Sequence, residues 1–289
     1  MALAAGAFAA AIALQIVRDE AYSRDESAER DLMYVQSPAA LRRIVLSFDA
    51  LAADVYWIRA LQHYGGDRLA KDKQRKYGLL YPLLDLATSL DPYFTIAYRF
   101  GAIFLSEAYP GGPGRPDQAI KLLEKGIEVQ PTKWQYYHDI AFVHYWQLHD
   151  MESAAKWFRM AATQPGAPNW LEPVAASMLI QGGDRASARF LLQQILKSEE
   201  QWLQRAATRG LQQLDALDAI DQLQAIVRRF PPPAGESYSW QWLIRRGVLR
   251  FGPPDPANVP FDIDPATGEV TVSKNSPLSP MPGKSAPPQ

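Results

Sequence analysis

The chain has 289 residues and an almost balanced charge, with 30 Lys and Arg against 31 Asp and Glu. This balance argues against a protein held on nucleic acid by neutralising phosphates. The absence of cysteine excludes disulfide frameworks, thiolate zinc sites and cysteine nucleophiles. A content of 47% hydrophobic and 21% charged residues is typical of a chain that buries a core, and this composition favours a binding protein over an enzyme.

Residues 1–17 carry no charged side chain. As a helix they would rise about 25 Å, slightly less than the roughly 30 Å hydrocarbon core of a bilayer. We expect a membrane anchor or signal-like helix here. Two alternatives stay open: a cleaved signal peptide, although no Lys or Arg precedes the apolar run, and a buried helix of the fold.

Residues 18–45 are expected to form a charged linker and the start of the first folded helix. Up to Asp31, three arginines are interleaved with six acidic residues. This pattern gives little information on orientation in a membrane. We expect the body to lie outside the cytoplasm, on the periplasmic side of an inner membrane, with the cytoplasmic face as the alternative.

A repeat occupies the middle of the chain, within residues 46–230. Two of its copies close at Pro131 and Pro165, which are 34 residues apart, and a third covers residues 169–198. Each copy has a first helix with a small residue in its middle, a short break, and a second helix that begins near an alanine. Proline ends the second helix because it lacks an amide donor and disfavours helix in the residue before it.

Small residues in both helices of each copy predict close helix–helix contact. Gly101 and Ala141 lie in first helices, Ala119, Ala154 and Ala188 lie in second helices, and the larger Phe158 fills the space beside them. We expect these to be the repeat-packing residues.

This pattern resembles the tetratricopeptide repeat (TPR), whose signature is W-x2-L-G-x2-Y followed by A-x3-F, an alanine and a proline. Phe100-Gly101 and Phe104 match its first helix, and Ala119, Leu123, Gly126 and Pro131 match its second. The phrase LAADVYWIRALQHYGG also resembles a segment of uncharacterised bacterial TPR proteins with an N-terminal membrane anchor. The resemblance implies an all-α solenoid of helical hairpins that binds other proteins.

Both flanks of the repeats offer additional helices. Upstream, one helix is expected to stop at Gly65-Gly66, and a partner helix closes at Pro92. Downstream, residues 199–230 are expected to form a further helix pair that caps the array, because repeat arrays need terminal units with a polar outer face.

The carboxy-terminal segment changes composition, since 13 of the 23 prolines lie in residues 231–289. Residues 231–274 are expected to form a small module of one helix and a β-hairpin, in which Phe261, Ile263, Val270 and Val272 face one side. Residues 275–289 are rich in proline and serine and are expected to be a disordered tail.

The TPR resemblance implies a concave groove lined by the first helices. Counting from the small residue places these side chains in the groove: Tyr98, Leu105, Gln135, His138, Phe142, Tyr145, Trp146 and Trp170. Aromatic side chains suit a protein-binding groove, because they offer large contact area at low entropic cost. The alternative is that several of them pack between repeats.

No catalytic, cofactor or metal site is expected. The histidines lack H-E-x-x-H spacing, and the glycine-rich stretch at residues 111–116 lacks the Lys-Ser/Thr of a phosphate loop. We therefore predict a membrane-tethered TPR scaffold, not an enzyme, that binds another protein or peptide as a subunit or assembly factor of a bacterial envelope or membrane complex. The alternative is an exported solute- or glycan-binding protein that uses the aromatic groove.

Overall fold

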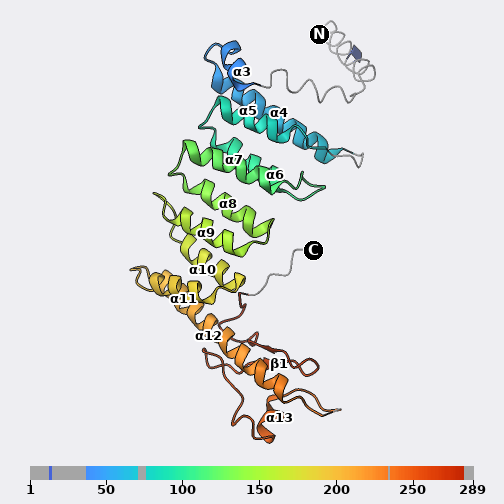
Figure 1. The fold of residues 1–289 in the computed structure, drawn as a ribbon, viewed down its shortest axis with the longest axis vertical. Coiled ribbons are helices and arrows are strands. Elements are labelled where there is room, and N and C mark those ends of the chain that lie inside the picture. Colours follow the sequence, from blue (N-terminus) through green and yellow to red (C-terminus); the bar gives the residue numbers. More distant parts are fainter. Residues whose placement is uncertain (1–12, 15–36, 71–75, 234, 283–289) are drawn as a thin grey trace, which may run out of the picture. The chain divides into compact units, whose positions relative to one another are not determined.

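The computed structural model describes residues 13–14, 37–70, 76–233 and 235–282. In these parts the chain is mostly helical, and consecutive helices pack in pairs (Figure 1). Apart from residues 13–14, the expected anchor at residues 1–17 lies outside the described residues, as does most of the charged linker. Among the helices that are described, none is both long and apolar enough to cross a bilayer.

The chain divides into two units, residues 1–129 and 130–289. In the first unit, helix α4 pairs with α5 and α6 pairs with α7, and α5 also packs on α6. The helices of this unit are α3 (Pro38–Ile44), α4 (Asp49–Leu69), α5 (Leu80–Leu90), α6 (Thr95–Ser106) and α7 (Pro116–Val129).

Helix α4 does not stop at Gly65-Gly66 as the sequence suggested, but continues to Leu69. The two glycines are simply part of the helix, and a Cβ at either position would meet nothing within 4 Å. The chain turns later, where Asp67 Oδ2 accepts a hydrogen bond of 2.6 Å from the amide of Tyr77. Pro82 lies in the first turn of α5, where its missing amide hydrogen costs no helical hydrogen bond.

The contact of α6 with α5 and α7 depends on Gly101. A Cβ at this position would lie 2.9 Å from Leu84 Cδ2 and 3.0 Å from Leu122 Cδ2. The absence of a side chain at Gly101 is therefore a steric requirement of this packing. Lys125 adds a polar link between α7 and α5, because its ammonium donates to Asp85 Oδ1 at 2.6 Å and to Ser89 Oγ at 2.7 Å.

In the second unit, each helix from α8 to α12 packs on the next. Asp150 and Asp184 cap α9 and α11 by accepting hydrogen bonds of 3.0 Å from the amides of Ser153 and Ser187. Hydrogen bonding to the side chains of these serines, followed by the bonds from their amides, lowers the pKa of both carboxyls. The helices are α8 (Trp134–Trp146), α9 (Met151–Ala162), α10 (Leu171–Gly182), α11 (Arg185–Ile195), α12 (Gln201–Arg229) and the short α13 (Trp240–Arg245).

The expected helix pair at residues 199–230 is one continuous helix of 29 residues, α12. Nothing in its sequence breaks it, since it contains no proline and its single glycine, Gly210, serves as a contact point. A Cβ on Gly210 would lie 2.9 Å from Leu192 of α11. Arg185 and Arg189 of α11 fasten the two helices further through ion pairs with the carboxylates of Asp215, Asp218 and Asp221, at 2.6–2.8 Å.

The carboxy-terminal module packs on the second half of α12. Strands β1 (Asp262–Ile263) and β2 (Val270–Thr271) form an antiparallel hairpin in which Ile263 pairs with Val270. The expected apolar face is present, because Phe261 and Val270 are buried in one cluster and Ile263 and Val272 pack against it. The cluster also contains residues of α12, so the expected boundary near residue 230 does not separate two cores. These residues are Ala216, Leu223 and Val227.

The expected disorder of residues 275–289 is wrong for the part that the structure describes, which ends at residue 282. Leu278 is only 1% exposed and belongs to the cluster on α12. Gln213 donates from Nε2 to the carbonyl oxygens of Leu278 and Pro280, at 2.8 and 3.1 Å. The segment cannot build a core of its own, but α12 and the hairpin supply one.

We predict that Gly101→Leu destabilises the first unit, because the new side chain has no room between Leu84 and Leu122. Overpacking of this kind costs about 1–3 kcal/mol or more. Thermal and urea unfolding followed by circular dichroism would measure the loss. The matched control is Gly66→Leu in α4, where no atom opposes a side chain, and equal stability of the two variants would contradict the assigned contact.

We also predict that Leu278→Ala lowers the free energy of unfolding of the second unit by about 2–5 kcal/mol, as expected for removing a fully buried leucine. Pro277→Ala, at an exposed neighbouring position, is the control and should have little effect. Unfolding in urea followed through Trp240, which lies in the same cluster, would report the change. A Leu278→Ala protein as stable as the control would mean that the tail does not support the core.

Candidate protein-binding surface

Helix α8 places five of the predicted groove residues on one side. Successive residues of a helix are rotated by about 100°, so Gln135, His138, Phe142, Tyr145 and Trp146 fall within little more than a quarter of its circumference. The opposite side is buried in the unit. Phe142 and Trp146 are each 45% exposed, so the structure brings these predicted residues together on an accessible face.

Three of these side chains form a continuous aromatic patch, defined here as Phe142, Tyr145 and Trp146. The rings of Phe142 and Trp146 are nearly parallel, with an interplanar angle of 7° and centroids 6.1 Å apart. Tyr145 lies 6.4 Å from Phe142 and 6.2 Å from Trp146. The rings therefore support one another and present their remaining surface to solvent.

His138 belongs to a second aromatic group, with Trp134 and Trp170. Its ring centroid lies 6.0 Å from that of Trp134 and 5.7 Å from that of Trp170, and both contacts are edge-on. Its Nδ1 lies 2.9 Å from Asp139 Oδ1. Trp170, 39% exposed, is the residue that precedes α10. The group packs α8 against the start of α10, and part of the Trp170 ring remains accessible to solvent.

Tyr98 does not share the exposure that the groove prediction requires. It is completely buried, and its hydroxyl lies 3.4 Å from the carbonyl oxygen of Thr88. Leu105 is also completely buried. The exposed residues of α6 are instead Ile96, Phe100 and Ile103, each 51–53% accessible.

The difference on α6 comes from counting outward from Gly101 as if it faced the same way as Ala141 of α8. A shift of one residue rotates a helix position by about 100°, and this rotation exchanges the buried and exposed sets. Counting from Ala102 instead gives Ile96 and Ile103 as outward positions. A regular spacing of Ile96, Phe100 and Ile103 was visible in the sequence, but the same apolar residues also fit a buried face.

The predicted repeat-packing residues lie in the interior. Ala119, Ala141, Ala154 and Ala188 are completely buried, and Phe158 is 4% exposed. With Gly101 they line contacts between neighbouring helices of each unit. They carry no surface on which a partner could bind.

A polar network at the end of α4 was not foreseen from the sequence. The hydroxyl of Tyr64 donates to Glu107 Oε2, while Arg68 donates to both Tyr64 and Glu107. Burial, followed by the neighbouring Glu107 carboxylate, raises the pKa of Tyr64 to about 12. Tyr77 also donates to the carbonyl oxygen of Pro110. These bonds fix the loop between α6 and α7, which contains the predicted glycine-rich stretch.

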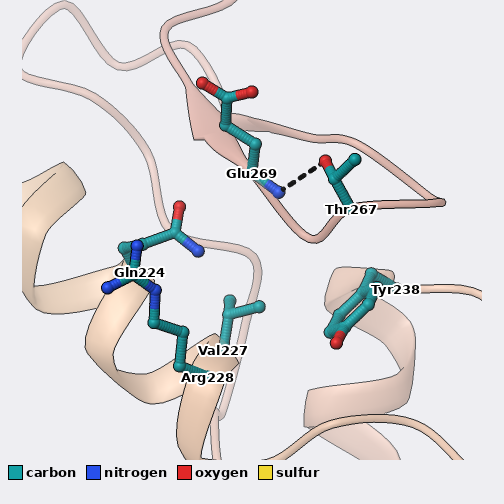
Figure 2. Close-up of a pocket in the computed structure, with 6 residues that line it drawn as sticks. All are labelled: Gln224, Val227, Arg228, Tyr238, Thr267 and Glu269. Atoms are coloured by element: carbon teal, nitrogen blue, oxygen red, sulfur yellow. Dashed lines mark hydrogen bonds between the residues drawn. The ribbon is translucent and has the colours of Figure 1, made fainter.

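Two surface cavities contain polar side chains that already have structural partners. One, of about 410 Å³, borders Lys125, whose ammonium links α7 to α5. The other, of about 320 Å³, lies between α12 and the hairpin and is lined by the residues of Figure 2. There Gln224 accepts from the amide of Val270 and donates to the carbonyl oxygen of Gly268, both at 2.9 Å. Gln224 therefore acts as an extra pairing partner for the hairpin.

No group of His, Asp or Glu side chains suited to hold a metal occurs in the described part of the chain. His144 lies 3.4 Å from Asp150 at the turn between α8 and α9, where Asp150 already caps the helix.

Comparison with known proteins gives no relative. No protein-family model, no curated protein and no solved structure matches this chain.

The two predicted groove aromatics Tyr98 and Phe142 should behave differently when truncated. Tyr98→Ala is expected to cost about 3–5 kcal/mol, since it empties a buried aromatic site. Phe142→Ala should change the free energy of unfolding by less than about 1 kcal/mol, because its ring is already half exposed. Urea unfolding of both variants is the measurement, and comparable losses would show that the aromatic patch is part of the core.

Proposed function

We propose that the protein is a helical-repeat scaffold of the TPR type that binds another protein through the aromatic patch of α8. The observation that carries the proposal is the mutual contact of Phe142, Tyr145 and Trp146 combined with the exposure of Phe142 and Trp146. Exposed aromatic rings are costly to leave in water, and clustered ones are typical anchors of protein interfaces. The sequential helix pairs and the small residues at their contacts support the repeat assignment.

The proposal includes a tether to a membrane through residues 1–17, with the body on the periplasmic side of an inner membrane. Its support is the uncharged run at the start of the sequence and the charged stretch that follows it. A tether confines a scaffold to two dimensions and so raises its effective concentration near partners in the same membrane. We accordingly propose a subunit or assembly factor of an envelope or membrane complex, without enzymatic activity.

The anchor is tested by deleting residues 1–17. The full-length protein is expected in the membrane fraction, released by detergent, and the shortened protein in the soluble fraction with unchanged helical content. The intact mass of the full-length protein distinguishes a retained anchor from a cleaved signal peptide. A shortened protein that still sediments with membranes would contradict the proposal that this segment carries the attachment.

The aromatic patch is tested with a Phe142→Ala, Trp146→Ala double variant of the full-length protein. It should keep its helical circular dichroism but lose the proteins that co-purify with the wild type from detergent-solubilised membranes, as identified by mass spectrometry. Truncating an interface anchor typically costs about 2 kcal/mol or more of binding free energy, so two anchors should reduce recovery of a partner by more than tenfold.

The matched control is a Phe190→Ala, Trp202→Ala double variant. It removes the same residue types at positions that are 61% and 44% exposed, on α11 and α12. It should recover partners as the wild type does. If both double variants bind equally well, the partner uses another surface and the proposal is wrong.

The second candidate is binding of a glycan or another flat solute, and the nearly parallel rings of Phe142 and Trp146 favour it. Such a platform suits stacking on a sugar face. Quenching of tryptophan fluorescence by soluble oligosaccharides, lost in the Phe142→Ala, Trp146→Ala variant but kept in the control, would favour this alternative.

A further inference from the structure

The carboxy-terminal tail contacts α12 in the way that a bound peptide contacts its receptor. Three successive carbonyl oxygens of the tail accept hydrogen bonds from α12. Gln213 donates to Leu278 and Pro280 at 2.8 and 3.1 Å, and Arg209 donates to Ser279 at 3.0 Å. Because every residue has the same carbonyl group, these bonds recognise an extended backbone whatever its side chains.

Leu278 is the fully buried apolar anchor of the tail, and Met281 packs against the same cluster. Leu278 is 1% exposed and inserts among Ala216 and Leu223 of α12 and Trp240 of α13, whereas Pro277 and Pro280 on either side are exposed. A segment that occupies this site therefore needs a leucine that can be buried, whereas the flanking prolines remain exposed.

A buried carboxylate fixes the start of the tail. Ser276 donates from Oγ to Asp255 Oδ2 at 2.5 Å and accepts from the amide of Leu278 at 3.1 Å. Asp255 itself is only 4% exposed and is held by the amides of Ala257 and Val259, both at 2.9 Å. This anchor lies beside the hairpin and marks the point at which the segment turns onto α12.

The tail is joined to the rest of the unit by side chains and not by a ladder of backbone bonds. In the described residues, its backbone–backbone hydrogen bonds are local, from Ser276 to Ser273 and from Ser279 to Ser276. Releasing it breaks three hydrogen bonds from α12, the hydrogen bond from Ser276 to Asp255 and the apolar contacts of Leu278 and Met281, but no helix or strand. Segments attached in this way open at lower free energy than the core around them.

We propose that α12 carries a peptide-binding site, made by Gln213, Arg209 and the leucine pocket, that the tail occupies in cis and that an extended segment of a partner protein occupies when it displaces the tail. The partner segment has the chemistry of the tail itself: an extended chain with a leucine flanked by Ser-Pro steps. This tail-binding site is distinct from the aromatic patch, so the variants of Phe142 and Trp146 leave it intact.

The tethered tail competes with any such partner. A segment on a short linker has an effective concentration on the order of millimolar, and a partner sees only the fraction of molecules whose site is open. The tail therefore lowers the apparent affinity of the site, so that a partner segment must be abundant or must bind the site tightly to displace it.

The test uses full-length protein and a fluorescent peptide of residues 275–282 as the probe. Leu278→Asp prevents the protein's own tail from entering the pocket but leaves the pocket unchanged. Anisotropy should show that the peptide binds this variant at least tenfold more tightly than it binds the wild type. Adding Gln213→Leu should weaken that binding at least tenfold, and a peptide in which aspartate replaces the leucine should not bind.

Two results would overturn the proposal. The first is a Leu278→Asp protein with native helical content that binds the peptide no better than the wild type. The second comes from hydrogen exchange of the unmodified protein and holds even where the variant fails to fold. We expect the amides of Leu278 and Ser279 to exchange at least tenfold faster than the most protected amides of α12, and equal protection would mean that the tail never leaves without global unfolding.

Discussion

The rest of the structure depends on how closely neighbouring helices approach one another. Two helices whose facing positions carry only hydrogen or methyl groups pack at short distance, and interiors tolerate little change in volume there. Gly101 meets this requirement in the first unit, and Gly210 meets it in the second, each against leucine side chains. The completely buried alanines, such as Ala141 and Ala154, play the same part at the neighbouring contacts.

The side of the helix on which a large residue lies decides whether its ring is buried. The aromatic rings of α8 divide between two sides of the helix: Tyr136 and Tyr137 are buried in the unit, whereas Phe142 and Trp146 remain half exposed. They reduce their cost in water by stacking on one another. The surface proposed for partner binding therefore follows from which side of α8 faces away from the unit.

Helix α12 belongs both to the helical array and to the carboxy-terminal module, which the sequence predicted to be separate segments. Its contacts with α11 close the array, through Gly210 in the first half and through the ion pairs that Asp215, Asp218 and Asp221 make with Arg185 and Arg189. Its second half carries Leu223 and Val227, which form the core of the carboxy-terminal module. Because α12 is one uninterrupted helix, loss of its contacts with either α11 or the carboxy-terminal module should lower the stability of both regions.

The sequence by itself determined the mostly helical class, most of the helix pairs, the buried small residues and the shared face of α8, because these follow from local periodicity and residue size. It did not determine the facing of α6, the continuity of α4 through Gly65-Gly66, or the ordering of the tail. Those depend on contacts between residues far apart in the chain. Tyr98 is buried because α6 is rotated against α5 and α7, and Leu278 is ordered because α12, 65 residues earlier at Gln213, supplies the partners that a proline-rich segment cannot provide for itself.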